Sequence, residues 1–417
     1  MIKAINKLQV LKKSLTAAAV AIAVLSTSVA AKDLVIAARD GIYGAAMEQT
    51  IAKYNQSNPD VKVELLKLPY ANLYEKLVIS LKGNASSYDL VLLDDTWATE
   101  FMKNDWLKEL KDVKADFVPA ALNISKYPIN TGKLYSVPLV GNVEMMAYRA
   151  DLLKKHGFDG LNSWTEVVKA AKTINENEAD VAGIVFRGAK GNPIVTGFLP
   201  IFWANGGEIV DSEGNVTLNS EAGQKALDQF LSLKPLAPKG VEIYNSTEVR
   251  DAIQQGKAAI AIEVWPSWVP SMDDPAKSKV VGKMTITAAP GEVKGPAPML
   301  GIWQLGITKG SKNADTARQF LDFMTSAENQ KALALELGLP PTRSSVYTDA
   351  DVVSKYRWYP AQLKALENGK PRPRIKKWKQ VETVLGDYLQ LALVGQMPAK
   401  QALKLAAKDI TRALRKK

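Results

Sequence analysis

Strands and helices alternate at the start of this sequence in a pattern that few folds can accommodate. Apolar runs and one stretch of alternating apolar and polar residues are separated by helical stretches. The predicted elements are, in chain order, a strand at 34–38, a helix at 43–55, a strand at 61–68, a helix at 72–81 and a strand at 88–93. Strands separated by helices of this length predict βαβ units and a parallel sheet.

Charged residues follow two of these strands directly. Arg39 and Asp40 come after the first strand, and Asp94 and Asp95 come after the third. In parallel sheets, ligands bind beyond the carboxyl ends of the strands. The sequence therefore predicts a polar binding edge at these positions.

The chain of 417 residues exceeds the size at which one hydrophobic core stops growing, so at least two lobes are expected. An extended segment at 144–149 is interpreted as the first crossing between lobes, and a buried strand at 256–263 as a return. Further crossings are expected near 263 and near 314–320. The predicted division is 1–30 a signal peptide, 31–143 the first part of lobe 1, 144–262 the first part of lobe 2, 263–314 a return to lobe 1, and 315–417 lobe 2 with C-terminal helices.

The N-terminus has the composition of a secretory signal peptide. Four lysines precede the apolar run Leu15–Leu25, and the small residues Ser28-Val29-Ala30 follow it. We expect cleavage after Ala30 or Ala31. A membrane anchor is the weaker interpretation, because the run is shorter than the roughly 20 apolar residues that a spanning helix needs.

The sequence contains no cysteine, so neither disulfides nor a lipoprotein attachment point are expected, and the mature protein is predicted to be free in the periplasm.

The net charge of +11 is concentrated at the ends of the chain: from Arg372 onward there are twelve Lys or Arg residues and three acidic residues. A basic amphipathic tail can bind nucleic acid or anionic lipid. We favour an exposed helix packed by Leu403, Ala406, Ile410 and Leu414, and expect no nucleic-acid partner for a secreted chain.

The sequence offers few residues that could form a catalytic site. His156 is the single histidine and lies in a polar run, which leaves no candidate for a nucleophilic triad or for a His or Cys metal site. No phosphate-binding or dinucleotide fingerprint follows a strand, and no cofactor is expected. Asp94 and Asp95 could serve a glycoside hydrolase, but adjacent strand residues point in different directions, which favours a binding loop.

Tryptophans mark the predicted strand ends more clearly. Trp97, Trp203, Trp265 and Trp303 each lie near turn residues and polar neighbours. A single tryptophan is more often part of a core, but four in similar places suggest flat surfaces for the C–H face of a sugar. The polar residues that could bind the ligand are Asp40, Asp94, Asp95, Asn142, Glu144 and Glu263 as acceptors, and Arg39, Arg187 and Arg374 as donors.

Several segments in order resemble family 1 extracellular solute-binding proteins of ABC importers, the group that includes maltose-binding proteins. The segments are Tyr88–Asp95 with Trp97, Gly132–Pro138, Tyr148–Leu152 with Gly157 and Trp164, Asn205–Gly207, Gly256–Trp268, and Gly306-Ile307 followed by Ser311–Asn313. The resemblance spans nearly the whole mature chain.

This resemblance implies an α/β periplasmic-binding-protein fold with two lobes, each a mostly parallel sheet flanked by helices, joined by crossover hinge segments. It places ligand contacts at Asp94 or Asp95, at Asn142, around Trp265 and at Trp303. Many members have Gly-Gly-Trp where this chain has Gly301-Ile302-Trp303, which leaves a backbone contact at Ile302 open.

The function expected from these features is capture of a sugar or polyol by a monomer and its delivery to the transmembrane subunits of an ABC importer. A receptor for a charged solute, either a polyamine or a phosphorylated polyol, is an alternative within transport. A secreted carbohydrate hydrolase using Asp94 or Glu263 is the alternative from another class.

Overall fold

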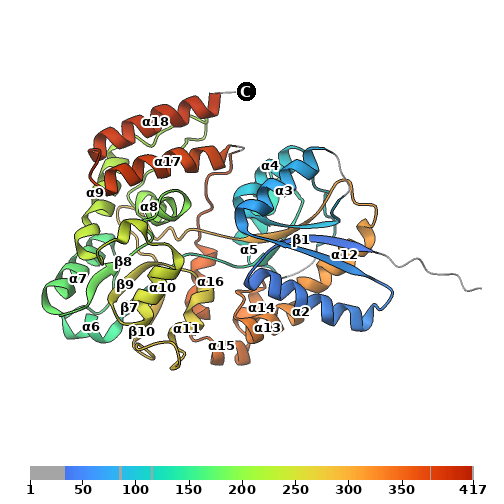
Figure 1. The fold of residues 1–417 in the computed structure, drawn as a ribbon, viewed down its shortest axis with the longest axis horizontal. Coiled ribbons are helices and arrows are strands. Elements are labelled where there is room, and N and C mark those ends of the chain that lie inside the picture. The colour runs from blue at the N-terminus through green and yellow to red at the C-terminus, as the bar shows by residue number, and fades with distance from the viewer. Residues whose placement is uncertain (1–32, 84–86, 114–115, 376, 416–417) are drawn as a thin grey trace, which may run out of the picture.

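The structure is a computed structural model that describes residues 33–83, 87–113, 116–375 and 377–415. The predicted signal peptide lies outside the described residues. The chain folds into two lobes side by side, each built on one β-sheet with helices around it (Figure 1). None of the helices in these ranges combines the length and the apolar character needed to cross a bilayer.

Lobe 1 contains a five-stranded sheet. Its strands, in spatial order, are β2 (Val63–Leu68), β1 (Leu34–Arg39), β3 (Leu90–Asp94), β11 (Trp303–Ile307) and β6 (Val137–Val140). The predicted β1, β2 and β3 form the parallel part, whereas β11 runs antiparallel to β3 and β6. Because of that direction, Trp303 at the start of β11 pairs with Asp94 at the end of β3.

Lobe 2 contains a four-stranded sheet, of which only one pair is parallel. Its strands, in spatial order, are β10 (Met284–Ala288), β7 (Met145–Arg149), β9 (Ala258–Val264) and β8 (Ala182–Val185). β8 pairs parallel with β9, and the other two pairs are antiparallel. The expectation of mostly parallel sheets is therefore wrong: both sheets are mixed, because chain segments that cross between lobes enter them in the opposite direction.

Helices cover both sheets. Those of lobe 1 are α2 (Ile42–Ser57), α3 (Tyr70–Lys82), α4 (Asp95–Lys103), α12 (Ala314–Met324) and α13 (Ala327–Leu337). Those of lobe 2 are α6 (Ala150–Lys155), α7 (Trp164–Asn177), α8 (Asn192–Ala204), α9 (Glu221–Ser232), α10 (Ser246–Gln254), α11 (Val269–Met272), α17 (Trp378–Leu393) and α18 (Ala399–Arg415). Between the lobes lie α5 (Pro119–Ile124), α14 (Ser344–Tyr347), α15 (Ala350–Lys355) and α16 (Tyr359–Glu367).

Buried apolar side chains form one core in each lobe and a third that joins the lobes. In α3, for example, Leu73, Leu77 and Leu81 recur every four residues and are buried in the lobe 1 core. The third core combines α5 and α16 with residues of the crossing segments, including Val143 and Leu300. The two lobes are thus connected by packing as well as by the chain.

The division of the chain differs from the expected one in two places. β10 belongs to lobe 2, although 263–314 was expected to return to lobe 1. α12 and α13 belong to lobe 1, where the apolar face of α12 packs on α2 and β11, although 315–417 was expected in lobe 2. Local periodicity could not predict these contacts, because β10 with β7 and α12 with α2 are segments far apart in the chain.

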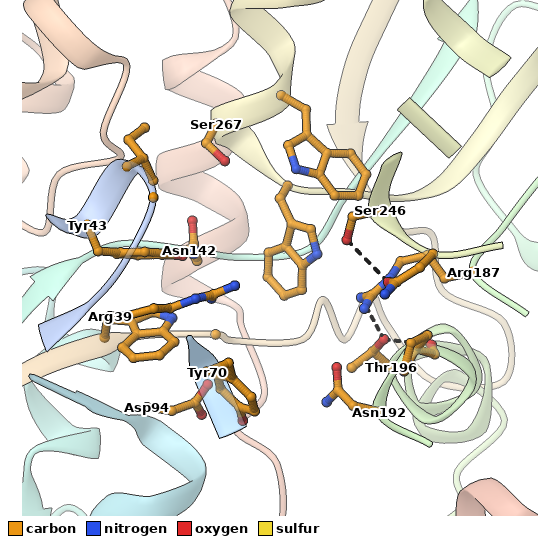
Figure 2. Close-up of a pocket in the computed structure, with 18 of the residues that line it drawn as sticks. Arg39, Tyr43, Tyr70, Asp94, Asn142, Arg187, Asn192, Thr196, Ser246 and Ser267 are labelled. Carbon is orange, nitrogen blue, oxygen red and sulfur yellow. Dashed lines mark hydrogen bonds between the residues drawn. The ribbon is translucent and has the colours of Figure 1, made fainter. Parts of the chain in front are cut away.

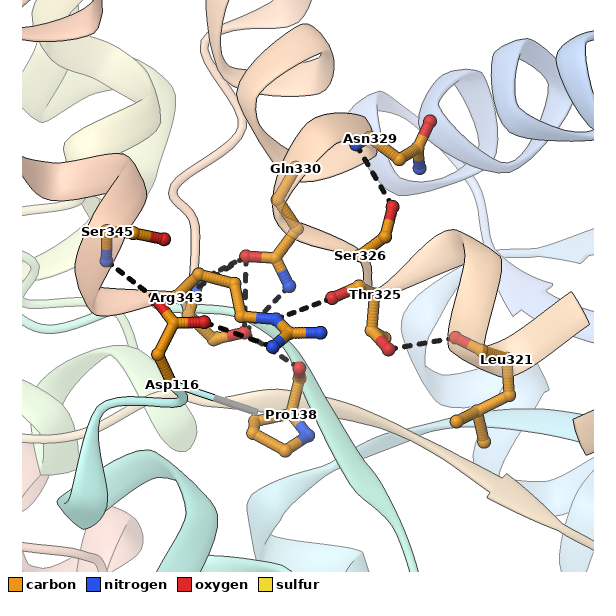
Figure 3. Close-up of polar contacts among 10 residues, drawn as sticks. Asp116, Pro138, Leu321, Thr325, Ser326, Asn329, Gln330, Arg343 and Ser345 are labelled. Atoms are coloured by element: carbon orange, nitrogen blue, oxygen red, sulfur yellow. Dashed lines mark hydrogen bonds and ion pairs between the residues drawn. The ribbon is translucent and has the colours of Figure 1, made fainter. Parts of the chain in front are cut away.

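Polar contacts tie the chain after α13 firmly to lobe 1 (Figure 3). The Gln330 side-chain oxygen accepts from the backbone N–H of Thr342 at 2.6 Å, and the Thr342 hydroxyl donates to the Pro138 carbonyl at 2.8 Å. Arg343 donates to the Thr325 carbonyl and to Asp116, at 2.7 and 3.1 Å. Lobe 1 therefore extends to this segment.

Three segments cross between the lobes and lie hydrogen-bonded to one another. The Gly301 N–H donates to the Asn142 carbonyl at 2.9 Å, and the Glu144 N–H to the Met299 carbonyl at 2.8 Å. The Leu300 N–H donates to the Lys370 carbonyl at 3.0 Å, which adds the third segment. The first crossing was expected at 144–149; the inter-segment bonds lie at its start and just before it, at Asn142 and Glu144, and the rest of it forms β7. The expected crossings at 263 and 314–320 are wrong, since these residues lie in β9 and α12.

The C-terminal segment is a helix, as expected. α18 packs on α17 and α9 through Ala402, Leu403, Ala406 and Ile410, with Leu414 partly buried against the same core. Lys404, Lys408 and Arg412 are exposed.

Neighbouring residues of α18 provide a direct test of this packing. We expect Leu403→Ala to lower the free energy of unfolding by about 2–5 kcal/mol, because Leu403 is only 1% exposed and its loss leaves a cavity. Lys404→Ala, one residue along and exposed, should change it by less than about 0.5 kcal/mol. Urea unfolding of both variants measures the difference. Equal effects would contradict the packing of α18 described above.

Candidate functional site

A cavity of about 550 Å³ lies between the lobes. Its volume falls within the roughly 300–1,000 Å³ usual for small-molecule sites. Figure 2 shows the two walls, with Arg39, Tyr43, Tyr70 and Asp94 on one side and Arg187, Asn192 and Thr196 on the other. The predicted site residues that line it are Arg39, Asp40, Asp94, Asn142, Arg187, Trp265 and Trp303.

The lobe 1 wall is an aromatic cluster that holds a guanidinium group. Arg39 ends β1, and its guanidinium carbon lies 5.0, 5.4 and 5.2 Å from the ring centres of Tyr43, Tyr70 and Trp303. Tyr43 and Tyr70 stand in the first turns of α2 and α3, the helices that follow β1 and β2. Contact between a guanidinium face and aromatic rings is attractive, so the rings hold Arg39 at the cavity.

Two carboxylates of the same wall share one arginine. Arg372 Nη2 donates to Asp94 at 2.9 Å and also to Asp95, and all three side chains are buried. Burial alone would raise the pKa of Asp94, but Arg372 and bonds from Asp95 and Thr96 hold that pKa below its usual value. Burial, opposed by Arg372 and aided by Asp94, raises the pKa of Asp95 to about 8. Asp94 therefore keeps its charge, and that charge is neutralised by Arg372.

The floor of the cavity is made by the crossing segments. Asn142 Nδ2 donates to the Tyr43 hydroxyl at 3.0 Å, while Asn142 Oδ1 is buried without a partner among the described residues. Beside it, a Cβ on Gly301 would lie 2.9 Å from Trp265. Glycine at 301 thus allows the Trp265 ring to reach the cavity.

The lobe 2 wall is organised around Arg187, which follows β8. Its Nε and Nη1 donate to Asn245 and Thr196, both at 3.1 Å, and its backbone N–H donates to Glu263 at 2.7 Å. Thr196 also donates to Glu263 at 2.9 Å. Burial, opposed by Arg187, raises the pKa of Glu263 to about 7. Glu263 therefore orients the Arg187 loop from behind.

Six predicted site residues do not line the cavity: Asp95, Trp97, Glu144, Trp203, Glu263 and Arg374. Most of them lie one layer behind it. Trp97 packs against Tyr70 and Trp303, at 4.8 and 5.6 Å between ring centres. Arg374 donates to the carbonyls of Asp95 and Ile124.

Trp203 was placed wrongly for a different reason. It was expected near a strand end but lies in the last turn of α8, buried, with the Lys370 ammonium 5.1 Å from its ring centre. No helix was predicted there, because α8 is largely apolar and contains Pro200, so its sequence shows no helical periodicity.

Other lining residues were not singled out from the sequence. They are Gly41, Ile42, Tyr43, Tyr70, Asn192, Pro193, Thr196, Asn245, Ser246, Ser267, Trp268, Gly301, Arg372 and Lys379. For Tyr43 and Tyr70 a signal existed, since both open a helix just after a strand. For Asn192 and Thr196 there was none, because their helix was not predicted.

The chain matches the family of bacterial extracellular solute-binding proteins over residues 38–331. It belongs to this family. Among proteins of known sequence, it is 28% identical over 372 residues to a probable ABC transporter-binding protein of Deinococcus radiodurans, covering 84% of this chain and 86% of that protein. It is 26% identical over 435 aligned residues to a mannitol-binding protein of Pseudomonas aeruginosa, covering 97% and 98%.

Comparison with solved structures supports the same family assignment. A maltose-bound MalE3 of T. maritima superposes with a TM-score of 0.82 at 27% identity, covering 92% of this chain and 100% of that one. A ribitol complex of an ABC transporter solute-binding protein from Agrobacterium radiobacter gives 0.81 at 27% identity, covering 91% and 98%. The chain is thus an ABC transporter solute-binding protein with a MalE-like fold, and members of this family bind solutes without transforming them.

Glu144 provides a test of the charges behind the cavity. It lies in the first crossing, 1% exposed, and its Oε2 has no partner in the part of the chain that the structure describes. Burial and the nearby Glu263 raise the pKa of Glu144 well above its usual value, against the opposing charges of Arg187 and Arg372.

We expect Glu144→Gln to gain stability relative to the unmodified protein as the pH rises. Below the unfolded-state pKa of about 4.3, both states hold the proton and the carboxyl adds no pH dependence. Above it, the unfolded chain releases the proton more readily than the folded chain, so folding loses stability until the pH passes the folded-state pKa. Glutamine does not titrate and avoids this loss.

Urea unfolding between pH 4.5 and 8 measures the effect. The difference in free energy of unfolding should move in favour of Glu144→Gln across this range, whereas exposed Glu64→Gln should show no comparable trend. A difference that stays constant with pH would show that Glu144 is not held in the environment described.

Proposed function

We propose that this protein is a periplasmic receptor that binds a sugar or polyol in the cavity between its lobes and delivers it to the transmembrane subunits of an ABC importer. Its relatives support this, since they include a mannitol-binding protein, a maltose-bound protein and a protein in complex with ribitol. The signal-peptide pattern of residues 1–30 and the absence of cysteine support a periplasmic protein without a lipid anchor, which we take to act as a monomer.

The observation that carries the proposal is the Asn142 side chain. It is 6% exposed, lines the cavity, and has an oxygen without a partner in the described ranges. Leaving a buried acceptor unpaired costs roughly 1–3 kcal/mol, which a ligand hydroxyl would recover by donating to it. The adjacent Tyr43 hydroxyl accepts from Asn142 and keeps its own proton to donate, since burial raises the pKa of Tyr43.

Aromatic faces complete a surface suited to a polyhydroxylated molecule. Trp265 and Trp268 are half-buried and line the lobe 2 side of the cavity. An indole face packs on C–H groups, while neighbouring amides and hydroxyls bind the hydroxyls of the same ligand. Such a combination favours sugars and polyols over purely apolar ligands.

Closure follows from the division of the site between lobes. A ligand that contacts Asn142 and Tyr43 on one side and Trp265 on the other gains both sets of contacts only in the closed state. It therefore shifts the equilibrium by the difference in its affinity for the two states. The three crossing segments, hydrogen-bonded at Asn142, Gly301 and Lys370, provide the hinge.

A thermal-shift screen of sugars and polyols, including mannitol, ribitol and maltose, tests the proposal. A ligand present at 100 times its dissociation constant should stabilise the fold by roughly 2.7 kcal/mol. If no sugar, polyol or acidic derivative of either stabilises the protein, the proposed function is wrong.

We expect Trp265→Ala to weaken binding of the best ligand from this screen at least tenfold. Truncation of a packed aromatic anchor costs roughly 2 kcal/mol or more. Trp106→Ala is the matched control: it is also half-buried but packs on Phe101, at 5.1 Å between ring centres, and does not line the cavity. Calorimetry measures the affinity of both folded variants for the ligand. Equal affinities would show that the ligand does not pack on Trp265.

We also expect a smaller radius of gyration when ligand is bound, with unchanged mass, because the lobes close as rigid bodies. Small-angle scattering with and without saturating ligand measures this. An unchanged scattering curve would contradict the closing receptor while leaving ligand binding itself intact.

A further inference from the structure

The charged side chains at the cavity are mostly cations. Four basic and two acidic residues line it: Arg39, Arg187, Arg372 and Lys379, and Asp40 and Asp94. Two of the four cations have acidic partners in the protein. Arg372 is bonded to Asp94 and Asp95, and Arg187 lies 3.9 Å from Glu263.

Arg39 and Lys379 have no such partner. Within the described ranges, no carboxylate lies within ion-pair distance of either, and the side chain of Arg39 makes no hydrogen bond. Arg39 is half-buried on the aromatic cluster, whose rings attract its guanidinium but supply no carboxylate to neutralise it. Figure 2 shows this side chain extending from the lobe 1 wall towards the middle of the cavity.

Both cations lie against the same ring, although they come from opposite lobes. The Arg39 guanidinium carbon is 5.4 Å and the Lys379 ammonium 5.8 Å from the centre of Tyr70. Arg39 stands at the end of β1 in lobe 1, and Lys379 in the first turn of α17 in lobe 2. Like charges in this arrangement repel, so approach of the two lobes brings an unfavourable interaction that an anion between them would relieve.

The carboxylates of the cavity do not offset this pair. Asp94 is bonded to Arg372, and Asp40 is exposed and forms no ion pair in the described part of the chain. A polyamine would meet two unpaired cations here, whereas a carboxylate or phosphate would meet two donors. Guanidinium groups bind such oxyanions with paired, charge-assisted hydrogen bonds.

We propose that the ligand is an acidic sugar or polyol whose carboxylate or phosphate binds between Arg39 and Lys379. This inference rests on the proposed function and specifies its substrate class. The hydroxyls of the same ligand bind Asn142 and Tyr43, and its carbon skeleton packs on Trp265. The anion also links closure to ligand charge, because it contacts one cation from each lobe.

Pairs of ligands that differ only in the acidic group test this proposal. Calorimetry compares gluconate with sorbitol, glucuronate with glucose, and mannitol 1-phosphate with mannitol. For at least one pair we expect the acid to bind tenfold or more tightly than its neutral partner. Its affinity should also fall more steeply with added NaCl. The three pairs distinguish open-chain carboxylates, ring carboxylates and phosphates.

Variants then locate the anion. Arg39→Gln and Lys379→Gln should each reduce the preference for the acid at least tenfold while changing the affinity for the neutral partner much less. Lys404→Gln on α18 is the matched control, because Lys404 is also an exposed cation but does not line the cavity. Urea unfolding checks that each variant is folded, and Lys379, being exposed, can be replaced without disturbing a core.

Each remaining outcome overturns the inference. If the neutral ligand binds as tightly as its acid in every pair that binds, or if the preference for the acid survives both substitutions, the anion site is absent or lies elsewhere, and the receptor for neutral sugars stands. If no member of any pair binds, and the wider screen is also negative, the proposed function fails with it.

Discussion

Everything at the cleft depends on backbone hydrogen bonds between three crossing segments that are remote from one another in sequence. More than 150 residues separate Asn142 from Gly301, and about 70 separate Gly301 from Lys370. The segments that contain these residues are nevertheless hydrogen-bonded to one another. These bonds place the carboxyl ends of β1 and β3 opposite the Arg187 loop. They also bring Gly301 next to Trp265, where a larger residue would displace the ring. The site is thus a consequence of how the lobes are joined.

The electrostatics of the cleft follow from which charges are neutralised within the protein. Arg372 bonds to Asp94 and Asp95, so the most prominent acidic pair in the sequence is not available to attract a cation. The aromatic cluster, by contrast, packs around the Arg39 guanidinium and supplies no carboxylate to neutralise it. A count of the lining charges gives four basic and two acidic residues but does not show which of them are neutralised. Pairing makes it a site with two available cations, one on each wall.

The sequence predicted the elements whose signals are local. β1, β2 and β3 and the helices between them were predicted because period and turn residues agree there. α8 was missed because a helix buried on all sides has no apolar stripe. β10 and α12 were assigned to the wrong lobe because their partners, β7 and α2, lie far away in the chain. Local pattern therefore revealed the fold class but not the path between the lobes.

The distinction between local patterns and distant contacts also explains which site residues could be predicted. Residues at the ends of predicted strands, such as Arg39 and Asp94, line the cavity as expected, and so does Asn142, which the family resemblance implied. Trp303 does so because β11 runs antiparallel, which brings its first residue beside the last residue of β3. Lys379 had no local signal at all: it opens a helix near the C-terminus and reaches the cavity only because the third crossing returns the chain past Asp94. A cation that completes the site from the other lobe is thus visible only once the crossings are known. Its position also gives the last crossing a role beyond connecting the lobes, since this segment supplies both the arginine that neutralises Asp94 and the approach to the lysine that remains unpaired.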